Sequence, residues 1–261
     1  MNSIDLVGSR EELALARAVL HRFASDLFRD PLPEREAEWQ RQSAGVLASL
    51  EVCQESGSPA ELATALEACV SGASDAGQAP AGSSARSGLD LAAQPYETEW
   101  PPAVGDLAKF HHIGDITEFY RAFGLERIQS DQRADHLSVE LAFMHFLCIK
   151  EAYAEENALA DLASICRDAQ RRFLGEHLAR WAPSFCAQME RTGERGFQPG
   201  AARFVEVWLA DESRRLATLH DERRAVPAAS ASSPAARCGD CRHTISCSER
   251  TSAHGADLGQ A

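Results

Sequence analysis

The segment LSVELAFMHFLCI, at residues 137–149, constrains the fold more than any other part of the sequence. Its apolar residues fall on more than one face of a helix, whereas a helix on a protein surface has a single apolar stripe. Such a helix is stable only when other elements surround it, so we expect it at the centre of a helical bundle. Asp135 and His136 directly precede it, and Glu140 shares a helix face with His136.

The rest of the chain also shows helical patterns. Ser9 and Glu12 have the spacing of a capping box, which predicts that the first helix begins there. No segment combines period-two alternation with β-branched enrichment, as a strand would. We therefore expect an all-α fold, a single globular bundle of roughly eight or nine helices. After the first helix, the predicted helices span residues 34–51, 59–70, 115–125, 137–157, 158–181, 184–191 and 200–224.

The adjacent histidines of HHIGD, residues 111–115, invite a metal-site interpretation. Adjacent histidines point in different directions on most backbones, however, and the spacing of HExxH sites is absent. We interpret this segment as a loop that enters the helix at 115–125. Asp115 would cap that helix and Gly124 would close it.

Two segments have the composition of linkers. Residues 71–88, SGASDAGQAPAGSSARSG, predict a mobile loop at about 71–94 inside one helical domain, residues 1–224. A domain boundary is the alternative, but the N-terminal helices alone would make a thin core. Residues 225–261 are predicted to form a low-complexity linker and a disordered, cysteine-rich tail.

The formal net charge of −13 at pH 7 limits the class of partner. Nucleic acids require a basic surface, so we expect none to bind, and a basic partner is favoured. No apolar run approaches the length of a membrane span and the N-terminus lacks a secretory-signal pattern, so we expect a cytoplasmic protein without membrane insertion. In that compartment we expect the cysteines to be reduced thiols or metal ligands and not disulfides. Five lie in predicted helices or directly after one, where we expect small buried apolar side chains: Cys53, Cys69, Cys148, Cys166 and Cys186.

The tail carries a different pattern, CGDCRHTISC, in which Cys238, Cys241, His243 and Cys247 are candidate metal ligands. The CxxC spacing lets two thiolates chelate one ion. The four residues could form a zinc site, or the three cysteines could hold an iron–sulfur cluster with one outside ligand. Redox-labile thiols and no role at all are the alternatives. The pattern suggests an alternative function, that of a metal- or redox-responsive helical regulator.

The residues alone leave three interpretations of Asp135 and His136 open. Asp135 can cap the helix beside a hydrogen-bonded His136, the pair can line a ligand or peptide site at the rim of the core, or it can act in acid–base catalysis. Catalysis has the least support, because no nucleophile, glycine-rich phosphate loop or second carboxylate pair accompanies it. We therefore expect no enzymatic activity.

Several segments together resemble the TorD/DmsD family of cytoplasmic redox-enzyme maturation chaperones, in helix order over roughly residues 10–222. The segments that carry the resemblance are PYETEW at 95–100, EFYRAFGL at 118–125, RADHLSVELAFMHFL at 133–147 and FLGEHLARWAPSF at 173–185. The family motif before the central helix is Pro-Asp-His followed by an apolar run with Glu. Asp135, His136 and Glu140 match it, while Ala134 stands where proline is usual, which removes some rigidity from the turn.

The resemblance implies an all-helical protein that is not an enzyme and requires no cofactor of its own. Such chaperones bind the twin-arginine signal peptide, the apo catalytic subunit, or both, of a molybdoenzyme of the dimethyl sulfoxide reductase family, and hold it until the molybdenum cofactor is inserted. Within the family, the pattern is most like that of chaperones serving ethylbenzene or dimethylsulfide dehydrogenase, or selenate or chlorate reductase. A monomer or a homodimer is expected. The residues implied to contact the client are Asp135, His136, Glu140, Tyr96, Glu97 and Tyr120.

Overall fold

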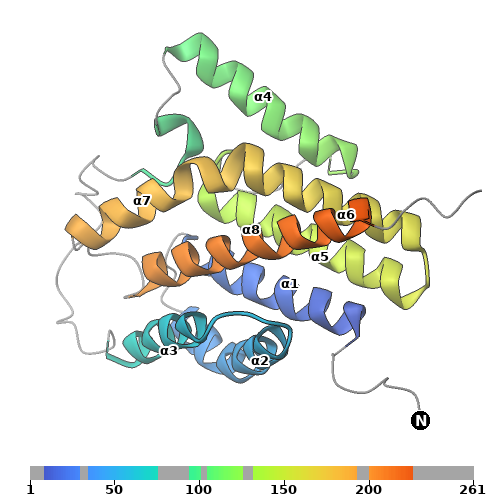
Figure 1. Cartoon of the computed structure of the whole chain (residues 1–261). Helices are drawn as coiled ribbons and strands as arrows, with labels where there is room; N and C mark the ends of the chain where they lie inside the picture. The colour runs from blue at the N-terminus through green and yellow to red at the C-terminus, as the bar shows by residue number, and fades with distance from the viewer. Residues whose placement is uncertain are drawn as a thin grey trace, which may run out of the picture. The chain divides into compact units, whose positions relative to one another are not determined.

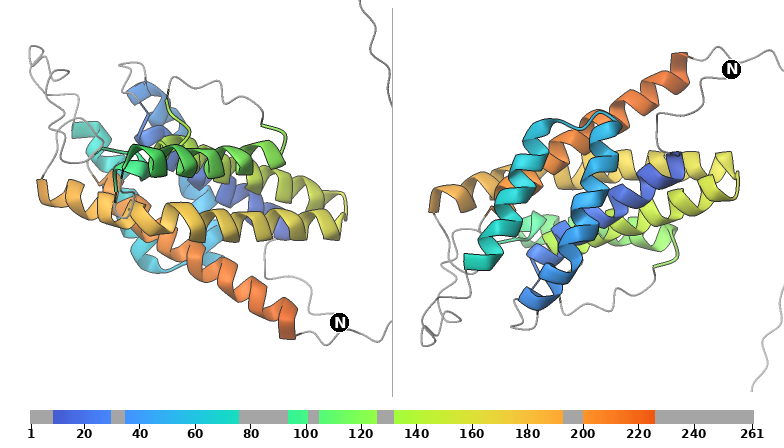
Figure 2. Two further views of the ribbon diagram at one scale, coloured as in Figure 1. Left: turned by 90° about the horizontal axis from the view of Figure 1, so that it is seen from above. Right: turned by 90° about the horizontal axis from the view of Figure 1, so that it is seen from below.

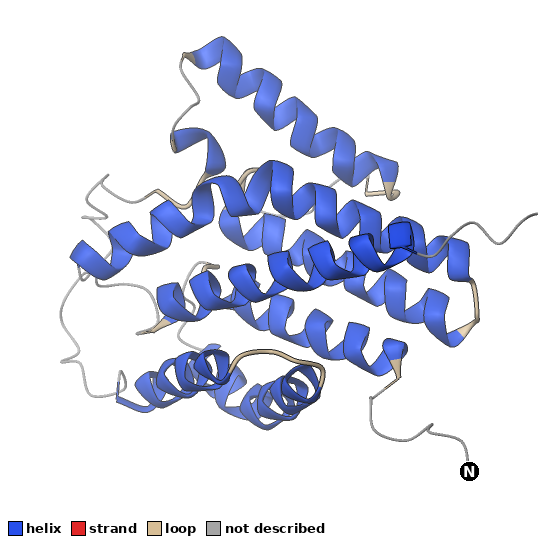
Figure 3. Ribbon diagram, in the orientation of Figure 1, coloured by secondary structure: helices blue, strands red, loops and turns tan. Residues whose placement is uncertain are grey.

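The computed structural model describes residues 9–29, 35–75, 94–100, 105–125, 132–192 and 200–225. Within these ranges the chain consists of helices and turns, and the one β-type contact is an isolated bridge between Tyr96 and His136 (Figure 3). The predicted all-α fold is confirmed. The helical elements are α1 (Arg10–Leu27), α2 (Arg35–Glu55), α3 (Ala60–Asp75), the 3-10 turn η2 (Glu97–Glu99), α4 (Asp106–Ala122), α5 (Leu137–Glu156), α6 (Ala160–Phe173), the π-helical turn η3 (Leu174–Leu178), α7 (Ala179–Thr192) and α8 (Ala201–Ala225). None of these described helices is long and apolar enough to cross a lipid bilayer.

Helix α5 lies at the centre of the bundle, as its sequence predicts. It packs along α1 and α6, while α8 packs against α3, α6 and α7. Helices α2 and α3 cover one side of this layer and α4 lies on the other (Figures 1 and 2). Leu137, Leu141, Met144 and Leu147 of α5 are completely buried. The core therefore forms around α5, and the Asp135–His136 pair lies directly at its start.

Two local predictions from the sequence are confirmed. Ser9 caps α1, because its hydroxyl accepts a hydrogen bond from the backbone N–H of Glu12 at 3.1 Å. The five cysteines in the helices are buried free thiols: Cys53, Cys69, Cys148, Cys166 and Cys186. Burial raises the pKa of the Cys53 thiol to about 12, which leaves it an inert apolar side chain.

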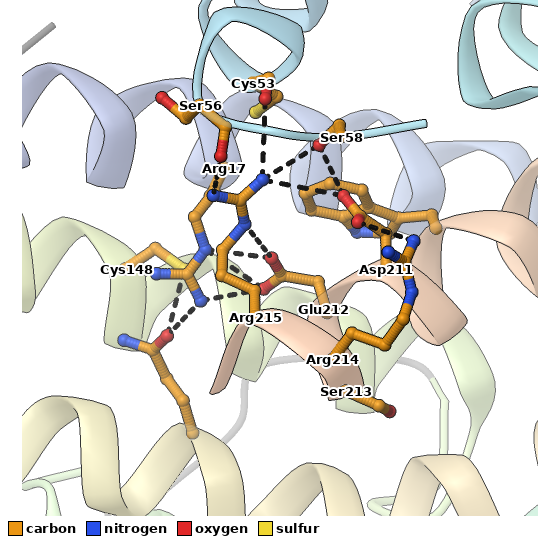
Figure 4. A network of polar contacts seen from close by, with 12 residues as sticks. Arg17, Cys53, Ser56, Ser58, Cys148, Asp211, Glu212, Ser213, Arg214 and Arg215 are labelled. Atoms are coloured by element: carbon orange, nitrogen blue, oxygen red, sulfur yellow. Dashed lines mark hydrogen bonds and ion pairs between the residues drawn. The ribbon is translucent and has the colours of Figure 1, made fainter. Parts of the chain in front are cut away.

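A buried polar network joins four helices inside the apolar core (Figure 4). Arg17 of α1 donates to Glu212 of α8, from Nε to Oε1 at 2.9 Å and from Nη2 to Oε2 at 2.7 Å. It also donates from Nη1 to Glu151 of α5 at 3.0 Å. Gln170 of α6 donates to the same carboxylate at 2.8 Å, and His21 bonds Glu212 through Nε2 at 3.0 Å. Arg17 thus neutralises the buried carboxylate of Glu212 and, together with Arg167, that of Glu151.

Helices α6 and α7 continue into each other through η3, where the sequence predicts two separate helices. Pro183 lies inside α7 and does not end it, although proline removes one backbone donor and crowds the preceding turn. The π-helical turn just before α7 widens the backbone and changes the direction of the side chains after it. It also places His177 in η3, where it points toward the segment around Glu97.

Helix α4 begins at Asp106, well before the start predicted at Asp115. Gly105 precedes it with φ of 87°, a left-handed conformation that glycine adopts easily. This start has no periodic signal in the sequence because α4 lacks an apolar stripe, and its Leu107 and Phe110 are 73% and 72% exposed. Residues 111–115 are therefore part of a helix and not a loop, and Asp115 is not its cap.

Helix α3 extends through Asp75, into the segment that the sequence predicts to be a loop. The rest of that segment, residues 76–93, lies outside the described residues, as do residues 226–261. The chain divides into two units after Ala225. The separation of a helical domain from a linker and tail stays a prediction.

Candidate functional site

The turn formed by Asp135 and His136 is held against the segment that contains Tyr96. The backbone N–H of Glu97 donates to the carbonyl of Asp135 at 2.9 Å, next to the bridge between Tyr96 and His136. The rings of Tyr96 and His136 pack edge to face with their centroids 5.0 Å apart. Two segments that are distant in the sequence therefore form one site at the start of α5.

The N-cap of α5 is His136 and not Asp135. The imidazole Nδ1 accepts a hydrogen bond from the backbone N–H of Ser138 at 3.1 Å and lies 2.8 Å from its hydroxyl. Because Nδ1 is the acceptor, the neutral ring carries its proton on Nε2. Capping by Asp135 was one of three interpretations of the pair. In the structure His136 is the residue that caps α5.

The carboxylate of Asp135 is completely buried and is surrounded by donors. Thr98 donates from its hydroxyl at 2.7 Å and from its backbone N–H at 3.3 Å. Arg133 donates from Nε to Oδ1 at 3.0 Å and from Nη2 to Oδ2 at 2.7 Å. This bidentate geometry is among the strongest that a carboxylate and a guanidinium group can adopt.

Arg133 forms the exposed layer of the site, with 44% of its side chain accessible to solvent. Its guanidinium carbon lies 4.5 Å from the centroid of the Tyr96 ring, and its Nη1 lies 3.6 Å from a carboxylate oxygen of Glu99. A buried carboxylate, an aromatic face and a second carboxylate are the groups that recognise a guanidinium ion. The site is thus a binding position for one guanidinium group, and the chain's own Arg133 occupies it.

Glu97 lies between two histidines. Its Oε1 is 2.8 Å from Nε2 of His112 on α4, and its Oε2 is 3.1 Å from Nδ1 of His177 in η3. Burial alone would raise the pKa of the Glu97 carboxyl, but hydrogen bonds from His112 and His177 outweigh it and lower this pKa. The hydrogen bond to Glu97 in turn raises the pKa of His112. Glu97 is therefore an ionised carboxylate that ties α4 to η3.

Glu140 and Tyr120 lie beneath the turn. Glu140 is completely buried; its Oε2 accepts from the indole N–H of Trp181 at 3.3 Å, while its Oε1 has no hydrogen-bond partner in the described part of the chain. Burial, reinforced by the charge of Glu97, raises the pKa of Glu140 well above its ordinary value. The hydroxyl of Tyr120 donates to the carbonyl of Ala134 at 2.9 Å, which fixes the turn from below.

We expect Glu140→Gln to stabilise the protein at alkaline pH. The unfolded chain loses the Glu140 proton above about pH 4.3, whereas the folded chain retains it because its pKa is raised. The contribution of Glu140 to stability is therefore full below that pH and declines as the pH rises. An amide accepts the Trp181 hydrogen bond without a charge. Urea unfolding should show that the gain of the variant over wild type grows from pH 5 to pH 8.

The matched control for this experiment is Glu156→Gln, which removes an exposed carboxyl at the end of the same helix. Its stability relative to wild type should vary little over the same pH range. A Glu140→Gln variant less stable than wild type at pH 8 would show that the buried carboxyl is ionised and bound to a partner.

The structure brings the six sequence-predicted contact residues into one region, but the acidic residues among them do not lie on its exposed surface. Asp135, Glu140 and Glu97 are buried and bonded within the chain, because the segment around η2 folds over the turn. The exposed layer consists of Arg133 and the acidic Glu99. A role in client contact stays a prediction for Asp135, His136, Glu140, Tyr96, Glu97 and Tyr120.

Sequence reasoning missed several partners at the site. Arg133 belongs to the motif segment, but only the folded turn shows that it bonds Asp135. His177 had no spacing signal, because η3 determines where it points. His112 was considered as a metal ligand without partners, and the structure supplies Glu97 and His177. The tail ligands Cys238, Cys241, His243 and Cys247 lie outside the described residues, and metal binding there stays a prediction.

Comparison with known proteins shows what the central part of the chain is similar to. The family model of the nitrate reductase delta subunit matches residues 88–187, which include η2, α4, the start of α5 and η3. No solved structure is significantly similar to the chain.

The similar curated proteins are assembly chaperones. The perchlorate reductase assembly chaperone of Dechloromonas aromatica is 35% identical over 130 residues, 44% of this chain and 57% of that protein. The selenate reductase assembly chaperone of Thauera selenatis is 34% identical over 98 residues, 37% of this chain and 50% of that protein. The chaperone TorD of Vibrio cholerae is 28% identical over 108 residues, 41% of this chain and 48% of that protein.

These matches confirm the resemblance to the TorD/DmsD family over the matched part of the chain. They also agree with the subgroup indicated by the sequence, since a selenate and a chlorate reductase chaperone are both among the similar proteins. The chain spans about half the length of the curated relatives it matches.

Proposed function

We propose that this chain is an assembly chaperone for the catalytic subunit of a molybdoenzyme of the dimethyl sulfoxide reductase family. It binds the apo subunit, its twin-arginine signal peptide, or both, and assists insertion of the molybdenum cofactor before export. The similar proteins support the chaperone role, because their names assign them to the assembly of oxyanion reductases. In this proposal the chain acts in the cytoplasm as a monomer or homodimer, without catalysis and without a required cofactor.

The observation that carries the signal-peptide part of the proposal is the position of Arg133. Its guanidinium group pairs with Asp135, stacks on Tyr96 and faces Glu99. An arginine of the signal peptide can make the same three contacts after Arg133 swings into solvent. Exchange is required because Thr98 and Arg133 already occupy the carboxylate oxygens of Asp135. We infer that Arg133 holds the site in a bonded state until a peptide arginine replaces it.

The exchange of one arginine for another is nearly neutral in free energy, so the net affinity must come from other parts of the peptide. Helix α4 offers apolar surface for this purpose, since Leu107 and Phe110 are largely exposed. Lys109, between them in sequence, donates to Glu99 at 2.7 Å, and Glu99 is the carboxylate that faces Arg133. Apolar and acidic groups thus lie next to each other, which suits a peptide with a basic pair and an apolar stretch.

Capture of the client from cells tests the proposed function. The tagged full chain, expressed in its host under molybdenum starvation so that apo subunit accumulates, should retain a molybdoenzyme catalytic subunit. Calorimetry with the leader peptide of that subunit should show binding, and a leader with both arginines replaced by glutamine should bind far more weakly. Retention of no molybdoenzyme subunit would reject the chaperone assignment. Retention of the subunit without any binding of its leader would reject the signal-peptide part alone.

A further inference from the structure

We propose that Glu97, His112 and His177 form a binding site for a Zn²⁺ ion, which fastens helix α4 to the rest of the bundle. The three residues come from three separate elements: Glu97 begins η2, His112 lies in α4 and His177 lies in η3. One ligand atom from each lies within 4.8 Å of the other two. Such a site would not depend on the proposed chaperone function.

The ligand atoms already converge on a common point. His112 Nε2 and His177 Nδ1 lie 2.8 and 3.1 Å from the two carboxylate oxygens of Glu97. The two imidazole rings have centroids 5.5 Å apart and are inclined by 59°. Ligand atoms around a tetrahedral zinc ion lie about 3–3.5 Å apart, given bonds of about 2.0–2.1 Å. Small rotations of the three side chains would therefore let one ion take the place of the two contacts between Glu97 and the histidines.

The chemistry of the ligands suits zinc. Two imidazoles and one carboxylate are an established ligand set for Zn²⁺, with a fourth position left for water or another ligand. The imidazole nitrogens that face Glu97 are the atoms that would coordinate, and each must carry no proton when it binds the ion. His112 is partly exposed, with 24% of its side chain accessible, which gives an ion access from solvent. Arg180 lies near His112 and opposes a cation there, but it is itself exposed and can move away.

Aromatic packing holds one of the rings in place. Phe119 of α4 packs edge to face on His177 at a centroid distance of 5.4 Å and an angle of 89°. Phe173, at the end of α6, lies 4.9 Å from the same ring. A ligand that is oriented before binding loses little side-chain entropy when the ion arrives. In this proposal the π-helical turn orients His177 toward Glu97 as a ligand, and such turns recur at functional sites.

A second cluster in the described part of the chain provides a contrast. His21, Cys148 and Glu212 are also close together, but all three are completely buried in the core network. The guanidinium group of Arg17 already neutralises Glu212 there. A cation at that position would be repelled and has no route from solvent. Among the described residues, no arginine or lysine is bonded to the carboxylate of Glu97, so a metal ion would not have to displace a cation to bind it.

Metal binding to a variant of the full chain tests this inference. The C-terminal candidate ligands are first removed with Cys238→Ser, Cys241→Ser and Cys247→Ser, and bound metal is stripped with a chelator. Titration with Zn²⁺ against a chromophoric chelator should show one site per chain. Co²⁺ should give the visible absorption of a tetrahedral complex without the thiolate charge-transfer band. His112→Ala should weaken Zn²⁺ binding at least about tenfold.

His111→Ala is the matched control, because it removes the neighbouring exposed histidine of the same helix and should leave Zn²⁺ affinity unchanged. His177→Ala should abolish binding, and circular dichroism checks that this buried substitution leaves the fold intact. No Zn²⁺ binding in the background that lacks the three tail cysteines would overturn the proposal. Equal weakening by His111→Ala and His112→Ala would also overturn it, since a nonspecific histidine pair would then explain the data.

Discussion

Arg17→Met should lower the free energy of unfolding by about 3–5 kcal/mol, the range seen when one partner of a buried ion pair is removed. Arg17 is the cation that neutralises Glu212 and, with Arg167, Glu151. Methionine fills similar volume but donates no hydrogen bond, so Glu212 would be left with His21 as its nearest donor. Urea unfolding followed by circular dichroism measures the loss.

Two further variants separate the missing charge from the missing volume. Arg22→Met removes an exposed arginine of the same helix whose ion pair is with Asp26, and should cost less than about 1 kcal/mol. Arg17→Met combined with Glu212→Leu removes both charges and should recover part of the stability, because apolar residues can replace a buried ion pair. If Arg22→Met and Arg17→Met cost the same, the buried network does not hold the four helices together.

The network also makes stability depend on pH in the acid range. Arg17 lowers the pKa of Glu212, although burial alone would raise it, and burial lowers the pKa of His21. In both cases the unfolded chain binds more protons than the folded chain. The contribution of Glu212 is present above its unfolded pKa of about 4.3 and is lost at lower pH; that of neutral His21 is present above about 6.5 and is lost as the pH falls below it. Glu140 acts in the opposite direction, so the two effects can be separated by substitution.

The sequence predicted the central helix well because residues 137–149 are apolar on several faces, and only a central position buries them. It could not predict η3, since a π-helical turn has no distinct residue pattern and arises from how α6 and α7 fit the bundle. The start of α4 was predicted wrongly for a related reason. Its exposed Leu107 and Phe110 belong to no apolar stripe, and Gly105 indicates a turn but not the type of element after it.

The site shows the same division between local and tertiary information. Local spacing correctly indicated that Asp135 and His136 lie at the start of a buried helix. The roles of the two residues were exchanged, however, because whether Asp135 caps α5 depends on Thr98 and Arg133, which reach its carboxylate from the side. Glu97 is hydrogen-bonded to His177, which is distant in the sequence. Tertiary pairs of this kind have no signature in a single sequence.

In a chain that already carries Arg133→Gln, Asp135→Asn should weaken binding of a twin-arginine leader peptide by roughly 30-fold or more, because no internal arginine then offsets the loss and removal of one partner from a desolvated charge pair costs about 2–5 kcal/mol. Asparagine keeps the size of the side chain and one acceptor for Thr98, so the turn can retain its shape. Calorimetry with the leader captured from the client subunit measures the loss. The substitution keeps the hydrogen bond from Thr98 and removes the charge pairing with an incoming arginine.

Arg133→Gln should have the opposite effect and strengthen binding of the same leader by about tenfold, because it removes the internal arginine that the peptide must displace. A purely structural role for Arg133 predicts the reverse, since loss of its bonds to Asp135 would loosen the turn and weaken binding. Arg121→Gln is the control, as Arg121 is an exposed arginine of α4 whose ion-pair partner is Glu118 of the same helix. The affinity of the Arg121→Gln variant for the leader should equal that of wild type. Weakening by Arg133→Gln would reject arginine exchange, whereas a gain in affinity from Arg133→Gln that a further Asp135→Asn removes requires that the peptide competes for Asp135.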